Sequence, residues 1–265
     1  MQHISGNRFV LRAIHLLIGM MLPAAVLIIW QIASSNGWVN AVLVPPPKDI
    51  LTEFGRMISS GELLTNLRIS AGRAALGFLI GGGLGLATGL WVGFSIKAER
   101  LLDPSLQLLR TLPHLAVAPL FILWFGFGET SKILLIAKGA FFPLYVNAFL
   151  GVRSVDRHLF EVARVLEFTR LQTITKLIIP ASLPSLFLGV RLSIAVSWLG
   201  LVVAEMMGSS SGIGYIINDA RSFSLTSVIF VGIIVFAIVG KVTDSLVKLA
   251  EKKLLRWQDS LEGGG

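Results

Sequence analysis

The stretch SAGRAALGFLIGGGLGLATGLWVGFS, from Ser70 to Ser95, decides the fold class of this chain. Apart from Arg73 it holds only apolar, small or hydroxyl residues, and it exceeds the roughly 20 residues that a helix needs to cross a bilayer. Glycines recur every four residues along one helix face: Gly77, Gly81, Gly85, Gly89 and Gly93. A face without side chains lets a second backbone approach closely. The stretch predicts a transmembrane helix packed tightly against a neighbour.

Similar apolar runs occur along the rest of the sequence, at about 13–33, 106–125, 133–152, 186–207 and 227–246. The chain of 265 residues is 54% hydrophobic and 14% charged, whereas soluble domains carry about 25% charged residues. We predict an all-α integral membrane protein, with residues 1–265 as a single domain of six transmembrane helices. The run at 13–33 is long enough to span and is expected to be retained. Residues 34–67 should connect two spans through a short amphipathic helix, and 258–265 should form a flexible tail.

Positive charge sets the expected orientation. An even number of spans puts both termini on one side, and most Lys and Arg residues fall on that side. The loop between the fourth and fifth spans alone holds Arg153, Arg157, Arg164, Arg170 and Lys176. Cytoplasmic loops carry the excess of basic residues, so this loop and both termini should be cytoplasmic. The net charge of +8 therefore reflects topology and not nucleic-acid binding.

Several kinds of chemistry are excluded. The chain has no cysteine, and its four histidines show no metal-ligand spacing. The segment from Gly126 to Lys132 fails the spacing of a phosphate-binding loop. We predict no catalytic residue, no metal site and no cofactor on this chain, which is not an enzyme. Any nucleotide chemistry must lie on another chain.

The loop at about 155–180 has an amphipathic pattern. Apolar residues recur at helical spacing in two short runs that meet near Glu167–Thr169. Such a cytoplasmic hairpin lies on the membrane or docks into a groove of a partner. Charged residues on its other faces favour the partner, because they would fix the orientation of docking. Glu161 is expected either to cap the hairpin or to pair with a basic group of that partner.

The residues of this loop resemble the cytoplasmic signature of the binding-protein-dependent permeases of ABC importers. That signature reads Glu-Ala-Ala, three residues, Gly, nine residues, then Ile-x-Leu-Pro. The matching positions here are Glu161, Val162, Ala163, Glu167, Leu177, Ile179 and Pro180. The main departure is Glu167, which stands where the family has glycine in the turn. A left-handed backbone at that position costs a non-glycine residue about 1–2 kcal/mol.

The resemblance covers most of the chain. LLDPSLQLLRTLPHLAVAPLFILWFG (101–126), GVRLSIAVSWLGLVVAEMM (189–207) and SGIGYIINDARSF (211–223) are similar to the branch that imports aliphatic sulfonates, taurine and nitrate, with the sulfonate permeases first. The resemblance implies the type I ABC importer fold, with a coupling-helix hairpin between helices 4 and 5, in a bacterial inner membrane. It also implies a homodimer with a second permease copy, two cytoplasmic ATP-binding subunits that hold ATP and Mg, and a periplasmic or lipid-anchored substrate-binding protein.

A few residues inside the predicted spans are candidates for lining a substrate pathway. Charges and breaks inside spans often serve function, which singles out Arg110, Pro113, His114, Trp124, Arg191 and Trp198. Arg110 could attract an anion at the inner mouth or snorkel to lipid headgroups. Pro113 and Pro119 should interrupt the third span, either to line a cavity or only for packing.

The remaining candidates have structural interpretations that compete with a pathway role. Packing or snorkelling is favoured for Arg191, and outward snorkelling for Lys138. His114 is expected to be a satisfied packing residue, and tryptophans near span ends are usually interface anchors. Glu205 is expected to hold the loop after the fifth span through backbone hydrogen bonds.

Alternatives stay open at this point. The same assembly could import nitrate, taurine, bicarbonate or a pyrimidine precursor. From another class, the chain could be an ATP-independent channel or secondary transporter, although no paired charges mark the midplane. A scaffold or receptor without transport would have no need of a docking hairpin.

Overall fold

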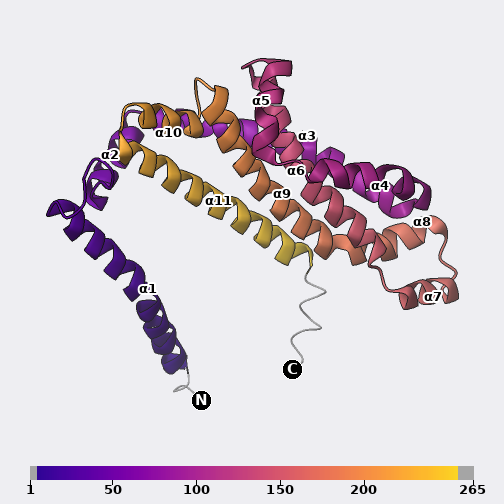
Figure 1. The fold of residues 1–265 in the computed structure, drawn as a ribbon. Helices are drawn as coiled ribbons and strands as arrows, with labels where there is room; N and C mark the ends of the chain where they lie inside the picture. Colours follow the sequence, from indigo (N-terminus) through magenta and orange to yellow (C-terminus); the bar gives the residue numbers. More distant parts are fainter. Residues whose placement is uncertain (1–4, 256–265) are drawn as a thin grey trace. The chain divides into compact units, whose positions relative to one another are not determined.

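The computed structural model describes residues 5–255, with the side chains of 5–18 and 157 excepted. Within this range the chain is helical and has no strand. The helices are α1 (Ser5–Ser35), α2 (Pro47–Ser59), α3 (Glu62–Phe94), α4 (Ile96–Arg110), α5 (His114–Phe125), α6 (Glu129–Arg153), α7 (Arg157–Val165), α8 (Arg170–Gln172), a π-helix (Thr173–Ile178), α9 (Ile179–Gly208), α10 (Ile213–Ser222) and α11 (Thr226–Leu254) (Figure 1). The tail predicted at 258–265 lies outside the described residues.

The chain divides into two compact units. The first comprises the chain up to Leu63 together with Ile216–Ile233. Within it, the rings of Trp30 on α1 and Phe230 on α11 lie 5.3 Å apart, and the Ser34 hydroxyl donates to the Val44 carbonyl at 2.6 Å. α2 is the short amphipathic helix expected between the first two spans. It begins at Pro47, where proline suits the first helical position because that amide needs no partner.

The second unit comprises Leu64–Tyr215 and the chain from Ile234 onward, and α3 lies against α6 inside it. The contact uses the glycine face predicted from sequence. A Cβ built on Gly77 would lie 2.5 Å from Ile136 Cγ2, and one on Gly89 would lie 2.5 Å from the Tyr145 carbonyl oxygen. At Gly81 the added carbon would run into the Ala137 carbonyl. The predicted close approach of two backbones is therefore confirmed.

α6 and α9 form the most extensive helix pair of the second unit. Small residues bring them together as well: Ser185 Oγ donates to the Asn147 carbonyl at 2.8 Å, and Ser193 Oγ donates to the Ala140 carbonyl. Gly189 is buried beside Asn147 and Leu144. Hydroxyl side chains that bond across helices satisfy their own polar groups where no water is present.

Four helical segments are long and apolar enough to cross a membrane: Glu62–Phe94, Glu129–Arg153, Arg170–Gly208 and Thr226–Leu254. They correspond to the predicted second, fourth, fifth and sixth spans. The predicted third span, 106–125, falls on α4 and α5, which meet at a 98° bend, in agreement with the interruption expected within this span. If this pair crosses the membrane as one broken span, it is the fifth candidate. In α1, the part whose side chains the structure describes, Gly19–Ser35, is apolar as well.

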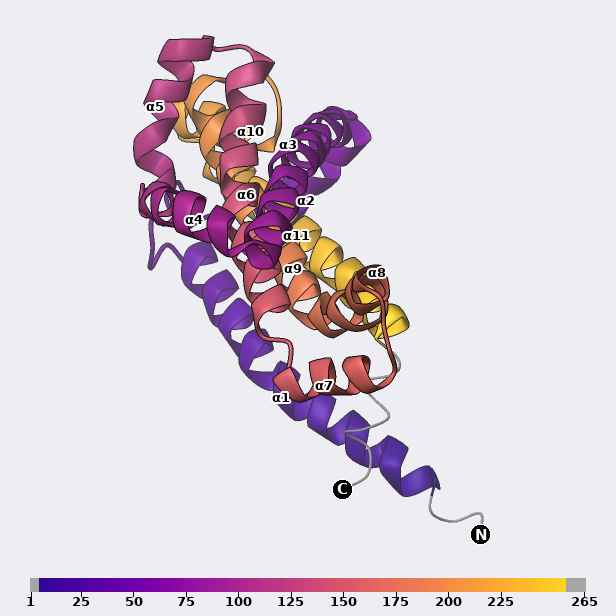
Figure 2. The ribbon, with the colours of Figure 1, turned by 90° about the vertical axis from the view of Figure 1, so that its right-hand side faces the viewer.

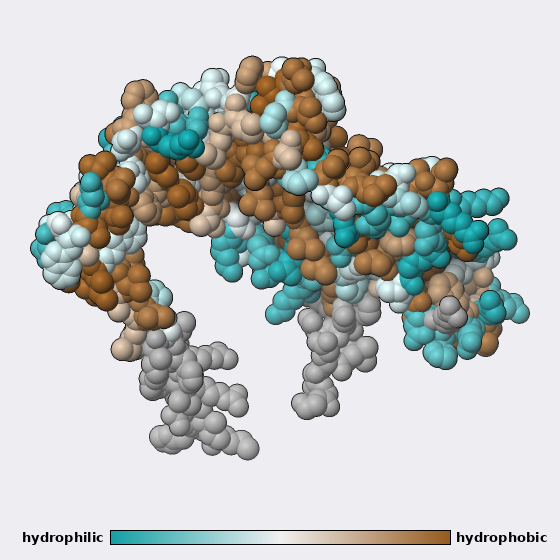
Figure 3. Space-filling model, viewed as in Figure 1, coloured by the Kyte–Doolittle hydropathy of each residue, from teal (hydrophilic) through white to brown (hydrophobic). Residues whose placement is uncertain are grey.

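The polar side chains of the second unit gather at the end that holds α7. Figure 2 shows α7 beside the end of α6 and next to α8. Figure 3 shows hydrophilic residues over α4, α7 and α8, and mainly apolar ones over α5. This distribution places the basic loop after α6 outside the apolar part of the unit.

Candidate functional site

The candidate site lies where the expected third span breaks. α4 ends at Arg110, α5 begins at His114, and Pro113 stands at the N-cap of α5 with φ −56° and ψ 131°. Proline has no amide hydrogen with which to continue α4, and its ring disfavours helical backbone at the preceding residue. The interruption predicted at Pro113 is therefore present. The one predicted at Pro119 is wrong, since this residue lies inside α5.

A cavity of about 490 Å³ opens at the break. Its polar lining residues are Arg110, Thr111, His114, Lys138 and Asn147, and its apolar ones include Leu112, Pro113, Phe142, Pro143, Val146, Leu192 and Val196. The volume is within the range of about 300–1,000 Å³ typical of small-molecule sites. No carboxylate is among these lining residues, so two cationic side chains face the cavity without a compensating acid. Such a cavity favours an anion.

Lys138 reaches this cavity from the middle of α6. Its Nζ donates to the Leu112 carbonyl at 3.0 Å, one residue before the proline that ends the helical path. The predicted outward snorkelling of Lys138 is wrong. The physical reason is the break itself, which leaves the carbonyls at the end of α4 without helical donors and offers them to a nearby cation.

His114 packs between glycines of two other helices. A Cβ on Gly139 of α6 would lie 3.1 Å from His114 Cε1, and one on Gly200 of α9 would lie 2.7 Å from His114 Nε2. This nitrogen is buried and makes no hydrogen bond to the part of the chain that the structure describes. The packing role predicted for His114 is present, but the expectation of a satisfied side chain is wrong for this atom.

The other predicted pathway residues do not line the cavity. Arg191 Nε lies 3.0 Å from an Asp244 carboxylate oxygen on α11, which agrees with the favoured structural role. The ring of Trp198 meets the Phe236 ring at 6.2 Å, edge to face. Trp124 is 64% exposed on α5. The structure therefore brings together Arg110, Pro113 and His114, and adds Lys138.

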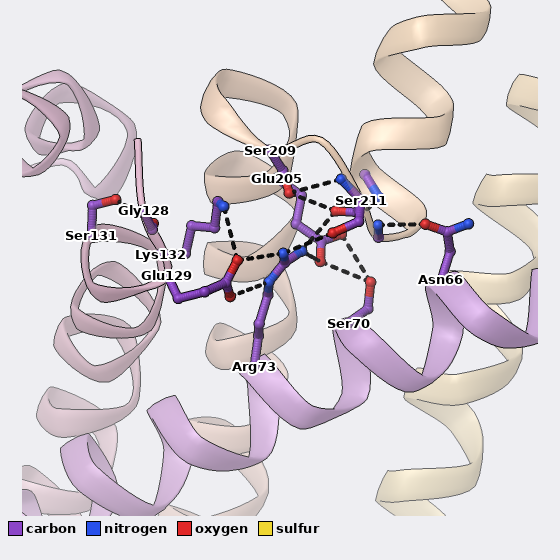
Figure 4. Close-up of polar contacts among 12 residues, drawn as sticks. Asn66, Ser70, Arg73, Gly128, Glu129, Ser131, Lys132, Glu205, Ser209 and Ser211 are labelled. Atoms are coloured by element: carbon purple, nitrogen blue, oxygen red, sulfur yellow. Dashed lines mark hydrogen bonds and ion pairs between the residues drawn. The ribbon is translucent and has the colours of Figure 1, made fainter. Parts of the chain in front are cut away.

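A second polar site lies at the N-terminal end of α6. The sequence pattern did not predict that its residues form a cluster. Figure 4 shows the Arg73 guanidinium of α3 between two carboxylates, Glu129 of α6 and Glu205 of α9. Arg73 is 5% exposed and Glu205 1%. Arg73 Nε and Nη2 each lie 2.7 Å from one oxygen of Glu129, and Nη1 lies 2.8 Å from Glu205 Oε1. The signal in the sequence was the lone charge inside the apolar stretch 70–95.

Glu205 also organises the loop that follows α9. Its carboxylate accepts from the Ser70 hydroxyl at 2.8 and 2.9 Å and from the Gly214 amide at 2.8 Å. Gly212 fits this loop because its φ is +107° and a side chain there would meet the carboxylate. The predicted role of Glu205 in holding the loop through backbone hydrogen bonds is confirmed.

The loop at 155–180 contains one separate short helix, α7, and a second helical run from Arg170 that continues through a π-helix into α9. The prediction of two short helices is therefore wrong for the second one, which is the beginning of a longer helical segment. The N-caps are Asp156, which accepts from the His158 amide at 2.9 Å, and Thr169, which forms a capping box with Gln172. Glu161 lies in the middle of α7 and caps neither helix, so the capping alternative is wrong. Its carboxylate is exposed, 3.7 Å from His158 Nδ1.

The turn between these helices keeps the conformation that glycine would favour. Glu167 has φ +52°, its amide bonds to the Arg164 carbonyl at 3.0 Å, and the Phe168 amide bonds to the Ala163 carbonyl at 2.9 Å. These two bonds form a Schellman motif, in which the left-handed residue is usually glycine. Glu167 therefore adopts the left-handed backbone conformation, with its unfavourable conformational free energy, at the position where the family signature has glycine.

The rest of the signature lies at the base of the loop. Val162 is exposed and Ala163 is buried. Leu177 packs against a cluster of Val152, Val155 and Ile178. Ile179 and Pro180 begin α9, so a π-helix and α9 continue from the hairpin without a gap. Sequence periodicity did not reveal the π-helix.

Long apolar helices and a bent helix pair beside a cationic cavity agree with a membrane protein that handles a small solute. The chain belongs to the family described as the binding-protein-dependent transport system inner membrane component, which it matches over residues 81–256. It is thus the permease component of an ABC transporter.

Individual relatives match nearly the whole chain. A putative aliphatic sulfonates transport permease protein of Bacillus subtilis (strain 168) is 61% identical over 92% of this chain and 89% of its own length. A protein of the same description from Escherichia coli (strain K12) is 46% identical over 89% of this chain and 90% of its own length. The taurine transport system permease protein of Escherichia coli (strain K12) is 30% identical over 90% of this chain and 89% of its own length.

Proposed function

We propose that this chain is the transmembrane subunit of an ATP-driven importer for a small organic anion, with aliphatic sulfonates as the first candidates. The observation that carries the proposal is the cavity at the α4–α5 break, which presents Arg110 and Lys138 and no carboxylate among its lining residues. The names of the 61% and 46% identical relatives support the sulfonate. Apolar side chains on the cavity wall suit the alkyl part of such an anion better than they suit nitrate.

The proposed topology has six spans in a bacterial inner membrane. The apolar part of α1 is the first span, and α4 with α5 is a broken third span. The carbonyls and amides freed at such a break are tolerated where they line a cavity. Both termini and the loop at 155–180 are cytoplasmic, in agreement with the excess of Lys and Arg on that side.

The proposed assembly has two copies of this chain, two cytoplasmic ATP-binding subunits and a substrate-binding protein on the outer side. ATP and Mg belong to the ATP-binding subunits. The hairpin at 155–180 is the coupling element: α7 offers an exposed face with Glu161, and the helical path from Arg170 to Gly208 joins the hairpin to α9. Movement of the hairpin would then tilt α9.

The test is uptake by the full complex reconstituted in liposomes together with its binding protein. We expect ATP-dependent uptake of a labelled short alkanesulfonate and no uptake of the alcohol of equal chain length. Arg110→Gln should lower sulfonate uptake, because it removes one cavity charge and keeps polarity. Arg100→Gln is the matched control, since Arg100 is exposed on the same helix and does not line the cavity.

Uptake without ATP would contradict the importer and favour a channel or secondary transporter. Transport of nitrate with no transport of sulfonate would retain the importer and replace the substrate. Unchanged sulfonate uptake in an assembled Arg110→Gln complex would remove the proposed role of that arginine.

A further inference from the structure

Lys138 is the unusual residue of the cavity. It is the only charged residue of α6 between Lys132 and Arg153, and one of its protons is used by the Leu112 carbonyl at 3.0 Å. An ammonium group has three protons to donate. The bond to Leu112 therefore fixes the position of the ammonium at the cavity wall and leaves donor capacity for a second acceptor.

Two further positive features converge on the same space. Arg110, the last residue of α4, lines the cavity, and so does His114, the first residue of α5. The N-terminus of a helix carries partial positive charge and amides without helical partners. Broken transmembrane helices present such ends to anionic groups of their substrates. The helix end is thus accompanied by two cationic side chains, one of them held in place by a hydrogen bond.

The rest of the wall is apolar. Phe142 and Val146 of α6 and Leu192 and Val196 of α9 line the cavity, one helical turn apart on each helix. A space lined by two cationic side chains and by an apolar wall matches a molecule with an anionic head and a short hydrocarbon tail. An inorganic anion would leave the apolar wall without a partner.

We propose that this cavity is a substrate site on the permease itself. In it, Lys138, Arg110 and the first amides of α5 bind the sulfonate head, and the alkyl chain lies against Phe142, Val146, Leu192 and Val196. The proposal rests on the proposed function and adds to it a binding site on this subunit. The Leu112 carbonyl is a positioning group, because it holds the ammonium of Lys138 and does not touch the anion.

The experiment uses the absence of native cysteine. Val146→Cys places one thiol at the cavity in the complete complex, held in neutral phosphatidylcholine nanodiscs. The thiol is treated with two methanethiosulfonates of similar size, one carrying a sulfonatoethyl group and the other a trimethylammonioethyl group. The ratio of the two rates reports the charge preference of the cavity, since any change in the fraction of thiolate affects both reagents alike.

We expect the anionic reagent to react faster and a soluble alkanesulfonate to protect the thiol. Lys138→Gln, introduced into the Val146→Cys chain, keeps a donor for the Leu112 carbonyl and removes the charge. The ratio of the rate of the anionic reagent to that of the cationic reagent should therefore fall about tenfold. Lys97→Gln is the control: Lys97 is exposed and outside the cavity lining, and the ratio should stay unchanged. If Lys138→Gln does not assemble, Arg110→Gln provides the same comparison, with a fall in the same direction.

An unchanged ratio in the charge-removing variant would overturn the proposal. So would protection by anionic lipid in the nanodisc without protection by soluble sulfonate, because the site would then hold a lipid headgroup. If the complex imports sulfonate but the thiol shows no charge preference, the site fails and the proposed function stands. If the thiol is protected by sulfonate but ATP drives no uptake, the proposed function fails and the site stands.

Discussion

The buried cluster around Glu205 allows a quantitative prediction about stability. Glu205→Gln keeps the volume of the side chain but replaces one acceptor oxygen with a donor. The carboxylate accepts from Ser70, Arg73 and Gly214, all at 2.8–2.9 Å, and its side chain is 0% exposed. Breaking one partner of a buried ion pair costs about 3–5 kcal/mol when the other charge is left without compensation. Arg73 keeps Glu129 as a partner here, so we expect a destabilisation at the lower end of that range, about 3 kcal/mol.

Glu129→Gln is the matched control on the same arginine. Glu129 also contacts Arg73, at 2.7 Å, but its side chain is 56% exposed. Water reaches the Glu129 carboxylate, although Arg73 itself is buried, so this pair should contribute about 1 kcal/mol or less. The two variants remove the same charge and the same volume. They differ in the burial of the carboxylate and in its second partners, since Glu129 also pairs with Lys132.

The assay is thermal unfolding of the purified chain in detergent, followed by tryptophan fluorescence at one fixed heating rate. A change of 1 kcal/mol corresponds to about 2–4 °C for a domain of this size. We therefore expect Glu205→Gln to lower the midpoint by roughly 10 °C and Glu129→Gln by about 3 °C or less. Because unfolding of membrane proteins is often irreversible, the ranking of the variants is the measured quantity.

A double variant separates charge pairing from packing. Arg73→Met with Glu205→Met removes both charges, and such a replacement of a buried pair is often neutral or stabilising. The double variant should lower the unfolding midpoint by less than the sum of the shifts caused by Arg73→Met alone and Glu205→Met alone. Equal midpoints for Glu205→Gln and Glu129→Gln, or additive costs in the double variant, would refute the reasoning from burial.

Four further predictions follow from the helix contacts and the 155–180 loop. Gly81→Ala should destabilise the chain by about 1–3 kcal/mol, because the new carbon meets the Ala137 carbonyl. Gly83→Ala, with nothing within 4 Å, should stabilise it by about 0.5–1 kcal/mol, and the reverse order in thermal unfolding would contradict the packing. A cysteine at Ser154, the exposed residue after α6, should react with an impermeant thiol reagent in inverted membrane vesicles but not in intact cells; labelling of intact cells would overturn the topology. Glu167→Gly should raise the free energy of unfolding by about 1 kcal/mol and leave coupling intact, because glycine adopts φ +52° without strain. Glu161→Lys should reduce substrate-stimulated ATP hydrolysis in a complex that still inserts into the membrane. Normal stimulation in this variant would exclude a role for Glu161 in docking to the ATP-binding subunit.

Sequence patterns predicted the features that depend on residues close together in the chain, such as an apolar run or a repeat along one helix. A bilayer requires about 20 apolar residues and satisfied backbone groups, so four spans appeared as continuous runs and are helices in the structure. The glycine repeat also acts through one helix face, so a close contact with a neighbouring helix followed from spacing alone, whereas the identity of that neighbour, α6, did not. The signature turn at Glu167 was predictable because the Schellman motif is local.

The charged clusters could not be predicted in the same way. Arg73 and Glu205 are 132 positions apart, and each alone looks like a costly charge near a span end. Their pairing depends on α3, α6 and α9 meeting at one level of the second unit. Hydropathy gives the depth of each charge along its own helix, but it contains no information about which faces meet.

Lys138 shows how one local break changes the meaning of a distant residue. From its place near one end of the predicted span alone, a lysine is expected to extend toward the nearest headgroups. That expectation assumes neighbouring helices whose carbonyls are all used. The proline that ends the helical path after α4 frees the Leu112 carbonyl, 26 positions before Lys138, and the ammonium bonds to it instead. For a half-buried cation beside a helix break made by proline, the free carbonyls of that break thus compete with the membrane surface as partners.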